Sequence, residues 1–105
     1  LVKRTPAPPG EVELASVVSP PLSRLIAETN QESDNVYAEA LLKTLGRLQE
    51  PTSLDTTTSG VNAVRSILTE LGVNPNRFTM VDGSGLAERN RASAEALVQT
   101  LQAMA

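Results

Sequence analysis

The chain has 105 residues, enough for one small domain, and it contains neither cysteine nor histidine. Disulfides are therefore excluded, as is any Ser-His or Cys-His mechanism within this chain. With a net charge of −3, aromatic residues at 2% and no basic stripe, nucleic-acid binding is not expected. Asp and Glu are dispersed, so we predict no metal site and no cofactor. No apolar run approaches the roughly 20 residues of a transmembrane helix.

The N-terminal part of the chain reads as extended. Residues 1–10 contain three prolines and are predicted to form a linker. Residues 11–18 carry spaced apolar side chains and are predicted to form a short strand. Ser19 follows, with two prolines after it, which is typical of an N-cap and a first helical turn.

Two helices are expected next, over residues 22–31 and 36–45. The second has apolar residues at spacings of one and four, with Tyr37 on the same stripe as Leu41, so we expect Tyr37 to pack in the core. Gly46 is the expected left-handed stop of that helix. Residues 47–59 are polar and rich in Thr and Ser, and are predicted to be a loop.

The C-terminal half predicts a helix over residues 60–71, ended by Gly72. A short strand or extended segment is expected at 78–81, followed by a tight turn at 82–85. Ser93 is the expected cap of a last helix. The apolar stripes of both helices are predicted to face the core; they comprise Val61, Val64, Ile67, Leu68, Leu71, Leu97, Val98, Leu101 and Met104.

The junction between the first two helices holds Ser33-Asp34-Asn35. A hydroxyl two residues from a carboxamide places both groups on one short, bent piece of backbone, where they can face the same cleft. Capping is the alternative explanation, because helices often begin with Ser, Asp or Asn. Both explanations can hold at once, and for Asp34 we favour capping alone.

Several phrases occur around this junction in a fixed order. They are Ser19-Pro20-Pro21-Leu22, Asn30-Gln31-Glu32-Ser33-Asp34-Asn35, Tyr37-Ala38-Glu39, Leu45-Gly46 and Val81-Asp82-Gly83-Ser84-Gly85-Leu86. From about residue 12 to residue 105, this succession resembles the D-alanyl-D-alanine carboxypeptidase/endopeptidase family of low-molecular-mass penicillin-binding proteins, the S13 serine peptidases. Ser-Asp-Asn is one of three active-site motifs of such enzymes.

The resemblance implies a mainly α fragment, with about four helices and one or two short strands, of an α+β transpeptidase/β-lactamase-like domain. Residues 11–105 would be the central part of that domain. It also implies a serine-type carboxypeptidase that cleaves D-Ala-D-Ala in peptidoglycan stem peptides through an acyl-enzyme. Its partners would be the stem peptide, β-lactams and the remainder of the domain, and its location the periplasm or cell envelope.

Four residues take roles by this resemblance. Ser33 would relay a proton towards the leaving amine, and Asn35 would donate a hydrogen bond to a substrate amide oxygen. Ser84 and Leu86 would contribute to substrate binding. The family commonly has Ser-Arg after that leucine, whereas this chain has Ala87-Glu88, which changes the expected recognition of a carboxylate-bearing side chain.

The other two motifs of the family, Ser-x-x-Lys and Lys-Thr-Gly, are absent from the sequence. Lys43 has Ala40 three residues before it, and Lys43-Thr44-Leu45 lies in a predicted helix and lacks the glycine. Because the chain begins at Leu1 rather than Met, we expect an internal piece of a longer protein, and because both motifs are absent we expect this piece to be inactive alone. The alternatives are a non-catalytic helical interaction module and a catalytically dead cell-wall homologue.

Overall fold

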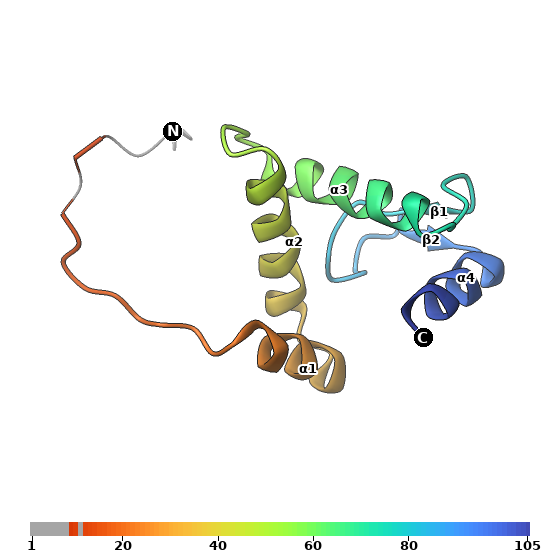
Figure 1. The fold of residues 1–105 in the computed structure, drawn as a ribbon, viewed down its shortest axis with the longest axis horizontal. Helices are drawn as coiled ribbons and strands as arrows, with labels where there is room; N and C mark the ends of the chain where they lie inside the picture. The colour runs from red at the N-terminus through yellow and green to blue at the C-terminus, as the bar shows by residue number, and fades with distance from the viewer. Residues whose placement is uncertain (1–8, 11) are drawn as a thin grey trace.

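The computed structural model describes residues 9–10 and 12–105, and most of the predicted linker lies outside these residues. Four helices and one two-stranded antiparallel ribbon make up the described fold (Figure 1), as the sequence predicts. In chain order the elements are α1 (Leu22–Glu32), α2 (Asn35–Gln49), α3 (Thr56–Glu70), β1 (Phe78–Thr79), β2 (Arg91–Ala92) and α4 (Ala94–Met104).

The predicted strand over residues 11–18 is wrong for the part that is described. Residues 12–20 have no regular structure, and the chain there runs away from the helices as an extended arc (Figure 1). Val12, Leu14, Val17 and Val18 are 80–97% exposed. A strand needs a neighbouring strand to satisfy its backbone groups, and in the described chain the only strand pair is β1–β2.

The N-cap of α1 is Pro21 rather than Ser19, so that prediction is also wrong. Pro21 offers its carbonyl to the backbone N–H groups of Arg24 and Leu25, at 3.0 and 3.2 Å, and no side chain caps the helix. Pro21 lies at the boundary because its fixed φ suits the entry to a helix.

The bend between α1 and α2 is built by the residues of the Ser33-Asp34-Asn35 motif. Ser33 adopts the left-handed conformation (φ 53°) and ends α1 by donating its backbone N–H to the Thr29 carbonyl. Asp34 caps α2, since its Oδ1 accepts a hydrogen bond from the Tyr37 N–H at 2.8 Å. The capping role predicted for Asp34 is confirmed, and Tyr37 is half-buried.

Gly46 does not stop α2, which continues to Gln49. A Cβ atom at Gly46 would collide with the Thr56 carbonyl oxygen and lie 2.6 Å from the Gly60 nitrogen. This glycine therefore permits a close approach between helices instead of ending one. The predicted loop at 47–59 is correspondingly shorter, because α3 already begins at Thr56.

The packing of α2 against α3 is the most extensive contact between helices of the described chain. Gly60 lies against α2, where a Cβ would collide with the Leu42 carbonyl. Leu42 and Ala63 are buried at this interface. Ser59 is buried beside them, and its Oγ lies 2.5 Å from Glu50 Oε2 at the end of α2, so the turn between the helices is also closed by a hydrogen bond.

The C-terminal half follows α3 and returns towards α2 (Figure 1). Gly72 ends α3 in the left-handed region (φ 91°), as predicted. β1 pairs with β2 with Phe78 opposite Ala92, and the strand is shorter than the predicted 78–81. Ser93 caps α4 by accepting the Ala96 N–H at 3.1 Å, which confirms that prediction.

The apolar stripe of α4 does not face a core, contrary to the sequence prediction. Leu97, Val98, Leu101 and Met104 are 53–71% exposed, and two members of the preceding stripe, Ile67 on α3 and Leu71 at its end, are nearly half exposed. The buried apolar side chains of the described chain are Leu42, Ala63, Val73 and, on α4, the small residue Ala96. Periodicity correctly identified an apolar face of α4, but the described chain leaves more than half of each of these four side chains exposed.

Replacing Gly46 by alanine tests the close approach of α2 and α3. In an exposed helix this substitution stabilises by roughly 0.5–1 kcal/mol. Here we expect the opposite sign, a loss of about 1–3 kcal/mol, because the added methyl group overlaps the backbone of α3. Urea unfolding followed by circular dichroism measures the change. A G46A variant as stable as the parent, or more so, contradicts the packing described here.

Candidate active site

Ser33 and Asn35 lie at the exposed bend between α1 and α2. Ser33 is the only non-glycine residue with positive φ in the described chain. Such conformations are uncommon and cluster at functional sites. Asn35 is the first residue of α2, and none of the side-chain hydrogen bonds found in the described chain involves its carboxamide, so that group is available to a ligand.

Asn35 lines an open hollow of about 420 Å³ between α2 and the loop formed by residues 82–86. Ser84 and Leu86, the two residues predicted to bind substrate, line the same hollow although they lie some fifty residues away in sequence. Ser33 lies at the bend between α1 and α2 and does not line this hollow. The full lining is Asn35, Val36, Glu39, Ala40, Lys43, Ser84 and Leu86.

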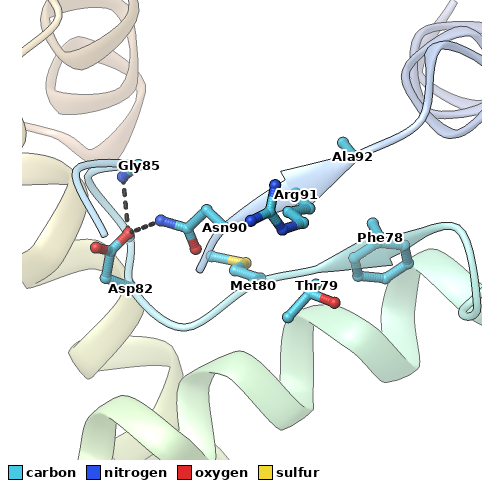
Figure 2. A pocket seen from close by; sticks show the side chains of 9 residues that line it. Phe78, Thr79, Met80, Asp82, Gly85, Asn90, Arg91 and Ala92 are labelled. Atoms are coloured by element: carbon cyan, nitrogen blue, oxygen red, sulfur yellow. Dashed lines mark hydrogen bonds between the residues drawn. The ribbon is translucent and has the colours of Figure 1, made fainter. Parts of the chain in front are cut away.

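The loop of residues 82–86 is shaped from within by Asp82 (Figure 2). One oxygen of Asp82, Oδ1, accepts hydrogen bonds from Gly85 N at 2.8 Å and from Asn90 Nδ2 at 2.7 Å, and the other accepts from Ala87 N at 2.8 Å. Asn90 in turn accepts the Val81 N–H at 2.9 Å. The loop therefore has a defined shape despite its two glycines.

These hydrogen bonds set the ionisation of Asp82. Desolvation raises the pKa of Asp82, but the hydrogen bonds donated by Asn90, Gly85 and Ala87 together outweigh it, so the net pKa is below the ordinary value. The group is a carboxylate at neutral pH and acts as an acceptor for the loop. The role of Asp82 here is to hold the shape of the loop.

Glu39 holds this loop against α2, a role that was not predicted from the sequence. Its Oε1 accepts hydrogen bonds from Gly83 N and Ser84 N, both at 3.0 Å, and from Ser84 Oγ at 2.9 Å. Desolvation raises the pKa of Glu39, but the hydrogen bonds from Ser84 and Gly83 more than offset this and the repulsion by Asp82, so the pKa is lowered. One sequence signal was available: Glu39 is four residues after Asn35, on the same helix face.

A second hollow, of about 340 Å³, lies along the β1–β2 ribbon beside the same loop (Figure 2). Phe78, Met80 and Ala92 provide apolar lining, and Arg91 brings a cationic side chain. Asp82 and Asn90 line it as well and are joined to each other by a hydrogen bond. None of the four predicted site residues lines this hollow, so we do not assign it to the site.

Two further findings bear on the chemistry available here. Within residues 9–10 and 12–105, no group of three or more carboxylates is placed to bind a metal ion. Lys43 lies within α2, as predicted, so Lys43-Thr44-Leu45 is helical and does not form a strand motif.

Comparison with known proteins gives one match along the whole chain. The family model described as D-Ala-D-Ala carboxypeptidase 3 (S13) matches residues 1–105. A carboxypeptidase of Mycobacterium tuberculosis is 35% identical over 100 residues, which is 94% of this chain and 21% of the relative. A D-alanyl-D-alanine carboxypeptidase of an Actinomadura species is 34% identical over 88 residues, 84% of this chain and 16% of the relative.

A penicillin-sensitive carboxypeptidase A of Dictyostelium discoideum is also similar, with 31% identity over 88 residues, 82% of this chain and 16% of the relative. The chain thus spans about one fifth or less of the length of these curated relatives. No solved structure matches the chain.

The lowered pKa of Glu39 predicts how stability depends on pH. A carboxylate with a depressed folded-state pKa stabilises fully above its unfolded pKa, near 4.3, and this contribution is lost as pH falls through the folded value. We expect the urea midpoint of the wild-type chain to fall on acidification below about pH 4.3. In Glu39→Gln the midpoint at neutral pH should be lower and the decline smaller.

Glu28→Gln is the charge-matched control, because the hydrogen bonds to the loop end on Glu39 and not on Glu28. That variant should keep the wild-type pH dependence. Identical pH profiles for Glu39→Gln and the wild type would contradict the contribution of the Glu39 carboxylate.

Proposed function

Because the chain belongs to the D-Ala-D-Ala carboxypeptidase 3 (S13) family, we propose that it is part of a serine-type D-alanyl-D-alanine carboxypeptidase acting on peptidoglycan stem peptides. The observation that carries this proposal is the hollow in which Asn35 faces the loop bearing Ser84 and Leu86. These residues come from distant parts of the sequence, and the family resemblance assigns all of them to one substrate cleft. A cleft beside an unpaired carboxamide suits an extended peptide.

In the proposed reaction, a serine attacks the carbonyl of the D-Ala-D-Ala bond, the terminal D-alanine leaves, and water hydrolyses the acyl-enzyme. Asn35 donates a hydrogen bond from its carboxamide to a substrate amide oxygen and so holds the peptide for attack. Ser33 passes a proton towards the leaving amine. Its left-handed backbone places Ser33 at the bend, one residue before the cap of α2.

The attacking serine must come from outside these 105 residues, since the sequence has no Ser-x-x-Lys and no Lys-Thr-Gly. The matched regions cover only 21% and 16% of two of the relatives, so a complete enzyme of this kind has ample further chain for both motifs. We therefore propose that residues 11–105 supply the Ser-Asp-Asn part of a transpeptidase-like domain and are inactive alone.

The uncovered apolar faces support a role within a larger domain. Leu97, Leu101 and Met104 of α4 are 56–71% exposed, and Val12, Leu14, Val17 and Val18 of the extended segment are more so. Contiguous exposed apolar surface usually marks a face that another part of a protein covers. We assign these faces to packing against the remainder of the domain.

The substrate places the enzyme in the cell envelope, because peptidoglycan is found there. In the described residues, no helix is both long and apolar enough to cross a bilayer. β-Lactams, which mimic the D-Ala-D-Ala terminus, are proposed to acylate the same serine in the complete enzyme. The penicillin sensitivity for which the Dictyostelium relative is named supports this assignment.

The isolated chain should not react covalently with β-lactams. We expect the intact mass of the 105-residue chain to be unchanged after incubation with benzylpenicillin, because no nucleophile motif is present. Electrospray mass spectrometry measures the outcome, with a complete penicillin-sensitive carboxypeptidase as the positive control. A stable adduct of the mass of the antibiotic on the chain would overturn the proposed division of the active site.

Asn35→Ala tests the assigned role of the carboxamide in the full-length protein. We expect the rate of acylation by a β-lactam to fall on the order of a hundredfold, the loss typical of one transition-state hydrogen-bond donor. Thermal stability should change little, because Asn35 is exposed. Asn62→Ala, at an exposed position of α3, is the matched control and should acylate at the wild-type rate. Unchanged acylation in Asn35→Ala removes the role assigned to Asn35.

A further inference from the structure

A single carboxylate oxygen joins the loop of residues 82–86 to α2. Three donors converge on Glu39 Oε1: the backbone N–H groups of Gly83 and Ser84, and the Ser84 hydroxyl, at 2.9–3.0 Å. Hydrogen bonds to an ionised acceptor are stronger than those between neutral groups. Of the side-chain hydrogen bonds found in the described chain, all those between this loop and α2 end on Glu39.

We propose that Glu39 is a positioning residue of the site, whose carboxylate holds Ser84 and Leu86 across the hollow from Asn35 and so sets the width in which the peptide substrate binds. The inference rests on the proposed function, and it concerns a residue to which the resemblance gave no role. Glu39 itself carries no proton in the reaction.

The backbone geometry shows why a carboxylate at this position can reach the loop. Gly83 lies directly on α2, where a Cβ atom would be only 2.6 Å from the Ala38 carbonyl oxygen. The absence of a side chain brings the N–H groups of Gly83 and Ser84 within reach of residue 39, the next position along α2. The loop is thus held by close backbone packing and by a charged acceptor at one point.

Glu39 and Asp82 have separate effects on the loop. The hydrogen bonds of Asp82 run to Gly85, Ala87 and Asn90, which are all in the same segment, so they fix the shape of the loop. They do not tie it to α2. The hydrogen bonds to Glu39, together with the close packing of Gly83 on α2, fix where the shaped loop lies relative to Asn35.

The same contact determines what Ser84 can offer to a ligand. Its hydroxyl proton is donated to Glu39, so the oxygen of this hollow-lining residue keeps only its acceptor capacity for a ligand. Ser84 can then accept a hydrogen bond from a peptide N–H, while Asn35 can donate to a peptide carbonyl. The two sides of the hollow would therefore match the alternating acceptors and donors of an extended peptide.

The first arm of the test uses the 105-residue chain and needs no activity. In ¹⁵N-labelled protein, the amide protons of Gly83 and Ser84 should shift together as Glu39 ionises, because both donate to its carboxylate. The shift should be absent in Glu39→Gln and retained in the control Glu28→Gln. If the amide proton chemical shifts of Gly83 and Ser84 do not change as Glu39 titrates, the proposal is overturned.

The second arm uses the full-length protein and a stem-peptide substrate. We expect KM to rise on the order of tenfold in Glu39→Ala, since a displaced loop weakens substrate binding, with kcat within about twofold of the wild type. Glu39→Gln, which keeps one acceptor oxygen, should show a smaller rise. Loss of folded enzyme alone would instead lower the apparent kcat and leave KM unchanged.

The outcomes of the second arm separate the inference from the proposed function. An active wild type whose Glu39→Ala variant keeps its KM overturns the positioning role and leaves the carboxypeptidase assignment intact. A wild-type protein that neither hydrolyses the peptide nor reacts with a β-lactam overturns the proposed function and, with it, the positioning role.

Discussion

The site depends on how closely backbone can approach one face of α2. Three glycines make this possible: Gly46 within α2, Gly60 on α3 and Gly83 in the loop. A Cβ atom at any of them would meet the backbone of a neighbouring element at or below 2.6 Å. Their contacts on α2 fall at positions 38, 42 and 46, which are successive turns of one helix face. The helix thus has a stripe against which both α3 and the loop lie at backbone distance.

The adjacent stripe of α2 carries the polar and charged side chains of the site. Asn35, Glu39 and Lys43 also follow one another at a spacing of four, and all three line the hollow. Because the neighbouring stripe fixes α3 and the loop so close, the polar stripe is brought within hydrogen-bond reach of the loop. The close packing at Gly83 and the hydrogen bonds of Glu39 are therefore parts of one arrangement, in which packing decides which polar groups can meet.

Local signals in the sequence were reliable at three helix ends, although the cap predicted at Ser19 was wrong. Asp34 and Ser93 cap their helices, and Gly72 ends α3, because each bonds within a few residues of itself. The helix stop predicted at Gly46 was wrong because a glycine near a helix end has two explanations, a left-handed stop and a close tertiary approach. Only the position of Thr56 and Gly60 in space decides between them, and that information is not in the local sequence.

Tertiary partners were the other limit of prediction. The apolar stripe ending at Leu101 and Met104 was correctly located, yet periodicity does not say what covers it. Residues 12–18 have the composition of a strand, but a strand forms only where another strand accepts its hydrogen bonds. Among the candidate site residues, Asn35 and Ser84 were found through the family resemblance. Glu39 was overlooked because an acidic residue on a helix usually faces solvent, and its partners lie 44 and 45 residues away.

The division between Glu39 and Asp82 gives a reason for two carboxylates around so short a loop. A loop containing Gly83 and Gly85 has many accessible backbone conformations, and an internal acceptor such as Asp82 removes most of that freedom. Fixing the shape does not fix the position, however, because the internal bonds move with the loop as a unit. A contact with a different element is needed for that, and α2 provides it through the close packing of Gly83 and through Glu39, which lies on the same face as Asn35. The loop is anchored to α2, the helix that also carries Asn35, so both walls of the hollow are held by one element. The spacing between these walls therefore does not depend on the exposed apolar faces of α4 or on the extended N-terminal segment.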